Sequence, residues 1–282
     1  MSSARCTRPM RVNRFLVFTS RLYYRTAGRA LVARALVAFF LGSAALHAQN
    51  SASGQHPRRP VLVELFTSEG CSDCPPADAL LAQLDATQFI PGAEAIVLSE
   101  HITYFNYLGW MDPFSSEAMT ERQKTYAREL SLDDVYTPQM VVDGTQQFVG
   151  SDGAKLKLAV GKAALTQKLD LQITSIRRLA DGSLDFSVHV PQNANATLLA
   201  AVALSKASSQ VKHGENANRV LNHVAVAQAI KDFGSGAIDG RTLHFSASEL
   251  ANAKNGGPLR LVVFLADRRG HVVGATERAI DQ

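Results

Sequence analysis

The sequence contains few cysteines, and this scarcity excludes a secreted domain held together mainly by disulfides. Only three cysteines and one tryptophan occur among 282 residues. Small exported domains that rely on disulfides for stability carry several pairs spread along the chain. With 46% hydrophobic residues, this chain can instead bury a core sufficient for one large or two medium domains.

Motifs of the common nucleotide-dependent and metal-dependent enzymes are also lacking. The sequence has no G-x-G-x-x-G, P-loop, G-x-S-x-G or H-E-x-x-H pattern, each of which marks a particular kind of site. A structural zinc site needs four ligands, and no second cysteine pair follows the single C-x-x-C. We therefore expect no resident metal and no bound cofactor.

Acidic residues are missing from the first 48 positions, which contain eight arginines. The uncharged run over residues 35–48 is 14 residues long, shorter than the roughly 20 that a membrane-spanning helix needs. An arginine-rich start, a short apolar run and small residues at its end are typical of a secretory signal. We therefore predict a signal peptide over residues 1–48 and a periplasmic or secreted protein. An uncleaved membrane anchor is the alternative.

Beyond this leader the chain has no excess of basic residues. Eight of the 29 lysines and arginines lie in the leader, which leaves 21 basic residues against 25 acidic ones. A mildly acidic body gives no reason to expect a nucleic-acid binder.

Hydrophobic patterns divide the rest of the chain into an α/β part and a β part. After a polar linker over residues 49–59, the patterns within residues 60–169 predict strand, helix, strand, helix, two strands and a helix. This order is the thioredoxin topology and predicts an α/β thioredoxin-like domain. Alternating patterns over residues 170–282 predict a small antiparallel β-sandwich domain, in which residues 223–232 fit a short helix or an edge strand.

Cys71 and Cys74 are the only cysteines outside the leader, and we expect them to be redox-active. Their C-x-x-C spacing closes so short a loop that a disulfide between them would stabilise the fold only weakly. Cys71 precedes a predicted helix, whose unpaired N–H groups and dipole favour a thiolate. We assign Cys71 as the solvent-accessible nucleophile and Cys74 as the resolving thiol. An inert turn disulfide is the alternative.

Two acidic neighbours modify the expected chemistry of the nucleophile. Glu69 and Asp73 flank Cys71 in the sequence, and a nearby negative charge disfavours a thiolate. We therefore expect the pKa of Cys71 to be less depressed than in strongly oxidising dithiol proteins.

Thr137 and Pro138 supply a second predicted element of the site. Pro138 opens the third strand of the predicted α/β domain. In thioredoxin-like folds a cis proline at this place lies beside the dithiol and exposes the backbone of the preceding residue to an extended substrate. We therefore predict a cis bond here, although only about 5–6% of X–Pro bonds are cis, and we assign Thr137 and Pro138 to substrate binding.

Several segments resemble the exported thioredoxin-like family described as domain of unknown function 1223. They are ELFTSEGCSDCPPAD (residues 64–78), YLGWMDPF (107–114), VYTPQMVVD (135–143) and FVGSD (148–152), together with residues 214–216, Arg219, Leu221 and His223. The resemblance implies an exported thioredoxin-like domain followed by a β domain, with Cys71, Cys74 and Pro138 at matching positions. It supplies no substrate, because the activity of the family is not established.

One loop departs from the pattern of the family. Where the family often has Asp, Trp and Asp, this chain has Thr103, Phe105 and Asn106. Two carboxylates are thus missing, which argues against acid–base or metal chemistry in this loop.

Other residues have both a functional and a structural interpretation. His101 fits a proton shuttle or metal ligand, but a hydrogen-bonded loop histidine is the simpler role. Met140 would complete a Cu(I) site with Cys71, Cys74 and His101, although a core methionine is the default. Two further sets stay open: the aromatic residues Tyr104, Phe105, Tyr107 and Trp110, which fit a partner groove or core packing, and His213 and His223, which fit a surface loop.

The sequence therefore predicts an exported thiol–disulfide oxidoreductase. Its expected partners are protein or small-molecule disulfides or thiols in the envelope, with no nucleic acid, and with membrane contact only through an uncleaved leader. The alternative is a non-enzymatic envelope binding module or Cu(I) carrier with a passive C-x-x-C.

Overall fold

The apolar run that begins the predicted α/β part forms β1, near the centre of an eight-stranded sheet. The computed structural model describes residues 57–192, 194–251 and 257–281, so the predicted signal peptide lies outside the described residues. β1 (Arg59–Thr67) is buried from Val61 onward and pairs in parallel with β2 (Ala93–His101). On its other side β1 pairs antiparallel with β3 (Gln139–Val142), which continues into β4 (Gln146–Val149).

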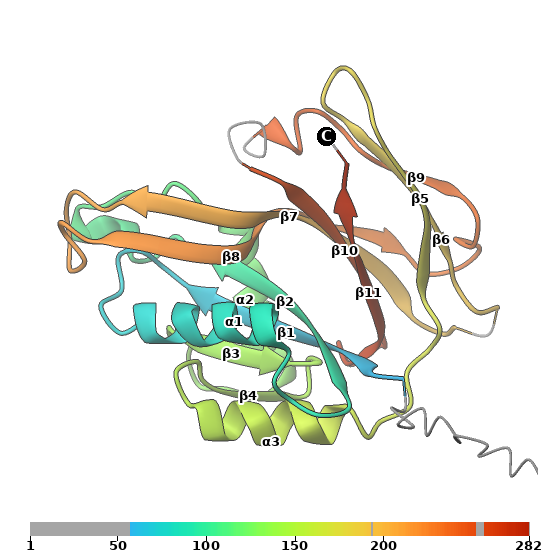
Figure 1. Cartoon of the computed structure of the whole chain (residues 1–282), viewed down its shortest axis with the longest axis horizontal. Coiled ribbons are helices and arrows are strands. Elements are labelled where there is room, and N and C mark those ends of the chain that lie inside the picture. The colour runs from blue at the N-terminus through green and yellow to red at the C-terminus, as the bar shows by residue number, and fades with distance from the viewer. Residues whose placement is uncertain (1–56, 193, 252–256, 282) are drawn as a thin grey trace, which may run out of the picture. The chain divides into compact units, whose positions relative to one another are not determined.

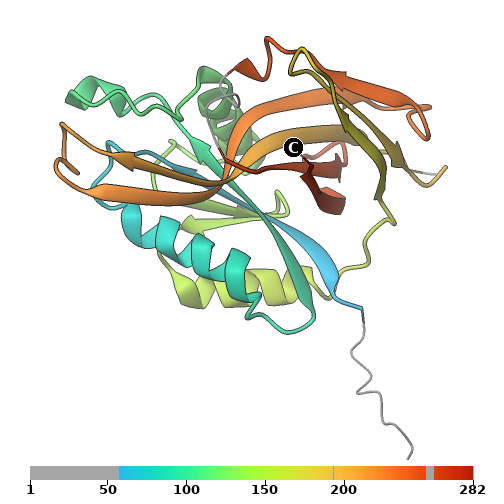
Figure 2. The same cartoon turned by 45° about the horizontal axis from the view of Figure 1, so that its top comes forward.

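Three helices cover the two faces of this part of the sheet (Figures 1 and 2). α1 (Pro75–Thr87) and α3 (Gly153–Ala163) pack on the face that carries Val63 and Leu65 of β1. α2 (Glu117–Glu129) packs on the opposite face, where Tyr126 contacts Phe66. Successive side chains of a strand point to opposite faces, so the continuously apolar β1 is buried from both sides.

Two of these helices begin directly after a capping side chain. Ser116 precedes α2, and its side-chain oxygen accepts a hydrogen bond from the backbone N–H of Met119. Asp152 precedes α3 and accepts from the backbone N–H groups of Ala154 and Lys155. Both are side chains that satisfy the otherwise unpaired N–H groups of a first turn.

The C-terminal half of the chain extends the same sheet. Its strands β7 (Thr197–Gln210), β8 (Val220–Gly234), β10 (Leu259–Ala266) and β11 (Val272–Ile280) complete the order β11-β10-β7-β8-β2-β1-β3-β4. The connection is made by β8, which lies parallel to β2 and pairs with it at Ser99 and Val226. Residues 223–232, which fitted a helix or an edge strand, thus belong to an interior strand.

A second sheet of three strands faces this extension. β5 (Gln172–Arg178), β6 (Leu184–His189) and β9 (Thr242–Phe245) form it in the order β5-β6-β9. Phe186 and Phe245 from this sheet share a core cluster with Val202 and Val263 from the large sheet. The mixed α/β class with antiparallel strands in the C-terminal half is therefore confirmed.

The C-terminal strands differ from the expected separate β-sandwich in one respect. Two sheets do face each other there, but the larger one is continuous with β1 and β2, and the described residues belong to one compact unit. The physical reason lies in β2, whose outer edge would expose unpaired backbone groups if β8 did not cover it. None of the helices in the described residues is long and apolar enough to span a membrane.

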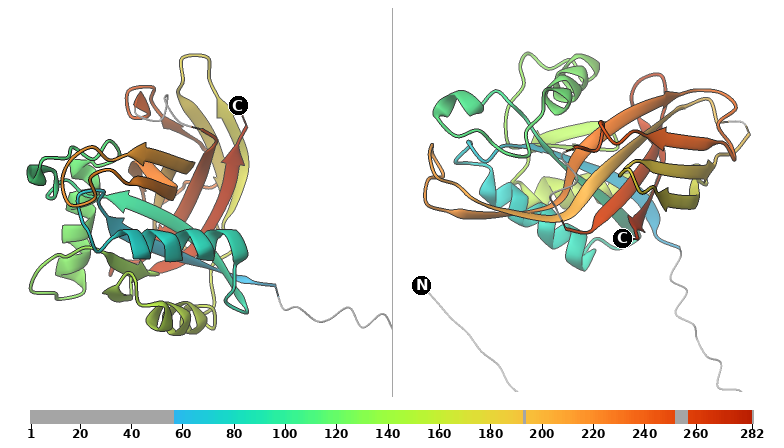
Figure 3. Two further views of the ribbon diagram at one scale, coloured as in Figure 1. Left: turned by 60° about the vertical axis from the view of Figure 1, so that its left-hand side comes forward. Right: turned by 90° about the horizontal axis from the view of Figure 1, so that it is seen from above.

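Three loops meet at one end of the parallel strands. Thr67 at the end of β1 lies opposite His101 at the end of β2, so the segments that follow both strands start at the same edge. The hairpin of β7 and β8 reaches this edge too, and its tip extends beyond the start of α1 (Figures 1 and 3). The predicted dithiol lies at this edge.

Candidate functional site

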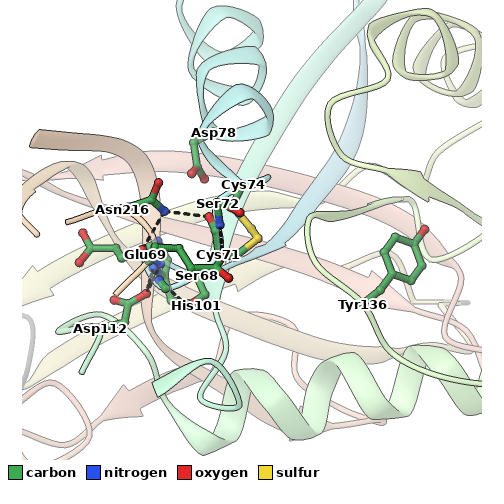
Figure 4. Close-up of a disulfide and its surroundings, with 12 residues drawn as sticks. Ser68, Glu69, Cys71, Ser72, Cys74, Asp78, His101, Asp112, Tyr136 and Asn216 are labelled. Atoms are coloured by element: carbon green, nitrogen blue, oxygen red, sulfur yellow. Dashed lines mark hydrogen bonds and ion pairs between the residues drawn. A yellow bond between two sulfur atoms is a disulfide. The ribbon is translucent and has the colours of Figure 1, made fainter. Parts of the chain in front are cut away.

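Cys71 and Cys74 form a disulfide in the short connection between β1 and α1 (Figure 4). The Cys71 backbone N–H donates to the carbonyl of Ser68, and Cys74 is the N-cap residue of α1. Two prolines occupy the first positions of the helix, where a missing N–H leaves no hydrogen bond unmade. The two cysteines therefore lie at the strand–helix junction that the sequence predicted.

Both cysteines are buried, and the expectation of a solvent-accessible Cys71 is wrong. The exposed fraction is 3% for Cys71 and 0% for Cys74. The helix start alone would leave Cys71 open to solvent, but segments far away in the sequence contact the backbone around it. These are the loop after β2 and the tip of the β7–β8 hairpin.

The tip of the β7–β8 hairpin is hydrogen-bonded to the backbone of the disulfide loop, defined here as residues 68–74 between β1 and α1. The side-chain amide of Asn216, itself fully buried, donates to the carbonyl oxygens of Glu69 (2.9 Å) and Cys71 (2.8 Å). The backbone N–H of Ser72 donates to a carboxylate oxygen of Glu215 at 2.9 Å. Three polar groups of the backbone around Cys71 are thus satisfied by this tip.

The loop after β2 covers the disulfide loop from another side. Gly70 lies against Phe105, because a Cβ added to Gly70 would stand only 3.1 Å from the Phe105 Cβ. Trp110 donates its indole N–H to Glu69 at 2.8 Å, and Asp112 accepts from the backbone N–H of Glu69 at 2.9 Å. Of the aromatic residues considered above, Phe105 and Trp110 therefore pack on the disulfide loop, whereas Tyr107 is 81% exposed.

Glu69 is the centre of a buried ionisable cluster, defined here as Glu69, Asp78, His101, Asp112 and His223. The Glu69 carboxylate accepts hydrogen bonds from Trp110 and Ser209 and lies 3.2 Å from Nε2 of His223. On its other side, Nδ1 of His223 lies 3.7 Å from a carboxylate oxygen of Asp78. The His223 ring is thus held between two carboxylates.

The surroundings of His223 favour its charged form. Burial alone would favour the neutral imidazole, but the nearby carboxylates of Asp78 and Glu69 outweigh it and raise the pKa of His223 to about 10. The interpretation of this residue as part of a surface loop is wrong. The structure instead places it in β8, buried beside the disulfide loop.

His101 and Asp112 form the second half of the cluster. Nδ1 of His101 lies 2.7 Å from Asp112, and the rings of His101 and His223 meet edge to face with their centroids 4.6 Å apart. Burial favours the protonated form of Asp112, but the charge and hydrogen bond of His101, with the backbone N–H groups it binds, lower its pKa. His101 is therefore a buried, hydrogen-bonded residue of the site.

The peptide bond between Thr137 and Pro138 is cis, as predicted. Gln139, the next residue, pairs with Phe66 at the end of β1, and the Pro138 carbonyl accepts from the backbone N–H of Gly150. A Cβ added to Gly150 would stand 3.1 Å from the Cβ atoms of both Pro138 and Ala77, which lies in the first turn of α1. Pro138 therefore lies beside the helix turn that begins at Cys74.

A second ionisable group lies on the α2 face of the sheet. The guanidinium of Arg122 donates to the carboxylate of Glu64 at 2.8 Å and lies 3.5 Å from the carboxylate of Glu100. The hydroxyl of Tyr126 also donates to Glu64. Burial, followed by the charge of Glu64, raises the pKa of Glu100 well above its usual range. This group is structural in position, since it supports β1 and β2 just before the site.

The residues of the alternative Cu(I) site have other roles in the structure. Met140 belongs to the hydrophobic core with Leu81 and Leu156, and Cys71 and Cys74 are bonded to each other. Among the described residues, no group of three or more His, Cys, Asp or Glu side chains is arranged to hold a metal ion.

Several residues of the site were not singled out from the sequence: Asp78, Asp112, Ser209, Glu215 and Asn216. Their roles depend on contacts across large sequence separations, such as the separation of 145 positions from Cys71 to Asn216. One signal was present, because Asp78, Asp112, Glu215 and Asn216 all lie in segments that carry the family resemblance.

Comparison with known proteins places these features in a family. A model described as protein of unknown function (DUF1223) matches residues 62–266. A crystal structure of a protein from Agrobacterium tumefaciens is similar, with 27% identity and a TM-score of 0.60, covering 78% of this chain and 94% of that one. HBP35 of Porphyromonas gingivalis is similar in fold alone, with 12% identity and a TM-score of 0.53 over 80% of this chain and 76% of its own. No curated protein matches this sequence.

Proposed function

This chain belongs to the DUF1223 family of proteins of unknown function, and we propose that it is a thioredoxin-like thiol–disulfide oxidoreductase. The observation that carries the proposal is the C-x-x-C disulfide at the junction of β1 and α1, with a cis proline beside the first turn of α1. Cys71 is the proposed nucleophile and Cys74 the resolving thiol, with Thr137 and Pro138 presenting backbone to the partner.

The proposed reaction transfers two electrons between the dithiol and a partner disulfide. In the reduced protein, the thiolate of Cys71 attacks one sulfur of the partner, forms a mixed disulfide and releases the other partner sulfur as a thiolate. The thiolate of Cys74 then attacks Cys71, which forms the intramolecular disulfide and releases the second partner thiolate. The partner is reduced and gains two protons, and the same steps in reverse oxidise a partner dithiol.

The start of α1 supports the thiolate that each step requires. Cys74 is the N-cap residue of α1, where the positive end of the helix dipole favours a thiolate. A second supporting feature is the buried cluster, whose member Asp78 lies in the first turn of α1. Asp78 follows Cys74 by one helical turn and donates its backbone N–H to the Cys74 carbonyl.

A passive structural disulfide accounts less well for this environment. The bridge spans three residues, so it removes little entropy from the unfolded chain. Burying ionisable side chains costs free energy even when they are paired, and Glu69, His101 and His223 are all buried beside the bridge. A bridge kept only for stability does not require such neighbours.

The proposed location follows from the arginine-rich leader. Residues 1–48 have the composition of a secretory signal, so the protein is proposed to act in the periplasm or outside the cell. Its proposed partners there are protein or small-molecule disulfides and thiols.

Trapping the mixed disulfide tests the proposal. Cys74→Ser and Cys71→Ser are made separately in protein lacking residues 1–48, and both are incubated with envelope extract and with a peptide disulfide. Exchange predicts adducts through Cys71 in Cys74→Ser and few adducts in Cys71→Ser, as read by mass spectrometry. Absence of adducts in both variants, with both proteins folded, contradicts the proposal.

A further inference from the structure

The tip of the β7–β8 hairpin, defined here as the tip loop (residues 211–219), bonds the backbone beside Cys71 in an ordered pattern. The side-chain amide of Asn216 donates to the backbone carbonyls of Glu69 and Cys71. The backbone N–H of Ser72 donates to the carboxylate of Glu215. Two acceptors and one donor in close succession are the groups that an extended polypeptide segment pairs with when it binds to another backbone.

We propose that the tip loop is a built-in cap that occupies the binding place of an extended polypeptide partner, and that such a partner replaces Asn216 and Glu215 when it reaches Cys71. This inference rests on the proposed disulfide exchange and specifies the class of partner. It explains a feature that exchange alone leaves unexplained, namely the hydrogen bonds from the tip loop to the backbone on both sides of Cys71.

The tip loop is a self-supporting unit that can move without unfolding the hairpin. Its neck is closed by backbone hydrogen bonds from Val211 to the Arg219 carbonyl and from Asn218 to the Val211 carbonyl, both 2.9 Å long. Within the loop, Arg219 donates to the side-chain oxygen of Asn216 at 2.7 Å. These bonds persist when the loop moves away from the disulfide, so opening breaks the hydrogen bonds that Asn216 and Glu215 make to the disulfide loop.

The strands of the hairpin remain in place by contrast. Ser209 of β7 and His223 of β8 both bind the buried Glu69 carboxylate. Separating a buried carboxylate from its charged and hydrogen-bonding partners is far more costly than breaking hydrogen bonds of a neutral amide. The boundary of the movable part therefore falls between these two residues.

The surface beside the tip loop offers apolar contacts to a polypeptide. A Cβ added to Gly214 would stand 3.4 Å from the Trp110 Cβ and 3.5 Å from the Leu108 carbonyl oxygen, so the tip lies against residues 108–110. The neighbouring side chains of Tyr107 and Met111 are 81% and 72% exposed. Large exposed apolar side chains next to a recognition site favour a polypeptide over a small thiol.

Reduction kinetics of the disulfide test the cap. The variants are Asn216→Ala, which removes both donors to the disulfide loop, and the control Lys212→Ala, whose side chain is exposed in the same loop. The reductants are a short peptide with one cysteine, the same peptide N-methylated on the residues that flank the cysteine, and N-acetylcysteine.

We expect Asn216→Ala to react with the peptide about 5 to 30 times faster than wild type, the factor that corresponds to the loss of one or two hydrogen bonds. Lys212→Ala reacts at the wild-type rate. In the wild-type protein, the unmodified peptide reacts several times faster than its N-methylated form and than N-acetylcysteine. Equal rates for Asn216→Ala and wild type overturn the cap, and equal rates for the two peptides overturn the polypeptide partner.

Hydrogen exchange of the wild-type protein provides a measurement that requires no variant. The Ser72 amide and the amides of the tip loop are expected to exchange together, and faster than those of β7 and β8. Exchange of Ser72 only at the rate of global unfolding overturns the cap. The reduction and exchange measurements do not require a physiological partner, so they test the cap separately from the proposed function. If the cap opens as expected but the trapping experiment yields no envelope adducts, the cap is supported and the proposed function is contradicted.

Discussion

At the scale of single residues, His223 links the stability of the protein to pH. Its pKa is raised to about 10 by Asp78 and Glu69, against about 6.5 in the unfolded chain. The folded protein therefore holds one more proton than the unfolded chain between these values. The stabilisation is fully present below pH 6.5 and is lost as the pH rises through 10.

This linkage predicts a difference in slope between wild type and His223→Gln. Between pH 7 and 9.5, the free energy of unfolding of wild type should fall by up to about 1.4 kcal/mol per pH unit more than that of the variant. Urea unfolding at several pH values measures both. Parallel pH profiles for the two proteins would show that His223 is neutral in the folded state.

Glu100 gives a second residue-scale prediction, of the same sign. Burial and the charge of Glu64 raise the pKa of Glu100. At pH values between the unfolded and the folded pKa, Glu100 is therefore protonated in the folded protein and ionised in the unfolded chain. The free energy of unfolding falls as the pH rises through this range. Glu100→Gln keeps a neutral side chain of the same shape. The variant should match wild type in acid and be more stable at alkaline pH in urea unfolding, and a variant less stable than wild type at every pH contradicts this.

At the scale of elements, the packing of Pro138 against α1 leaves no room beside Gly150. A Cβ on Gly150 would stand 2.7 Å from a buried Leu65 methyl group and 3.1 Å from Pro138 and Ala77. Gly150→Ala should therefore destabilise the fold by about 1–3 kcal/mol and slow disulfide exchange.

A matched control separates crowding from loss of glycine. Gly161 lies in α3 with no atom within 4 Å of an added Cβ, so Gly161→Ala should stabilise the protein by roughly 0.5–1 kcal/mol. Thermal unfolding of both variants measures the contrast. Similar effects of the two substitutions would show that Pro138 and α1 are not tightly packed.

The elements around the disulfide were the most predictable, because their signals are local. An apolar run, a C-x-x-C and prolines at a helix start identify β1 and α1 within about 20 residues of sequence, and the cis bond at Pro138 was also expected. The burial of Cys71 was not predictable in this way. The hairpin that binds the Cys71 backbone through Asn216 is fixed in position only once β8 pairs with β2, and β8 has a pattern that suits a helix or a strand.

At the scale of the whole molecule, the large sheet makes the two halves of the chain depend on each other. The change of pattern at residue 170 predicts a second domain, yet β8 pairs with the open edge of β2 and β7 pairs with β8. On the α2 face, Leu62 and Leu98 share a core cluster with Ala201 and Phe264. Local sequence patterns indicate where the type of element changes, but they do not predict that β8 pairs with β2.

A chain truncated after residue 169 should therefore fail to form a stable structure. It would expose the edge of β2 and the apolar surface that Ala201 and Phe264 cover. Circular dichroism and urea unfolding measure the result. A cooperative transition as steep as expected for 110 folded residues would show instead that the N-terminal part is an independent domain.

A redox titration of the native protein tests the central claim most directly. Protein lacking residues 1–48 is equilibrated in glutathione buffers, the fraction of disulfide is counted by mass spectrometry after alkylation, and the fold is followed by circular dichroism. We predict a reversible two-electron transition of a folded protein with a midpoint above about −300 mV, the region below which structural disulfides resist glutathione. A bridge that stays intact in the most reducing buffer, or opens only as the protein unfolds, contradicts the account.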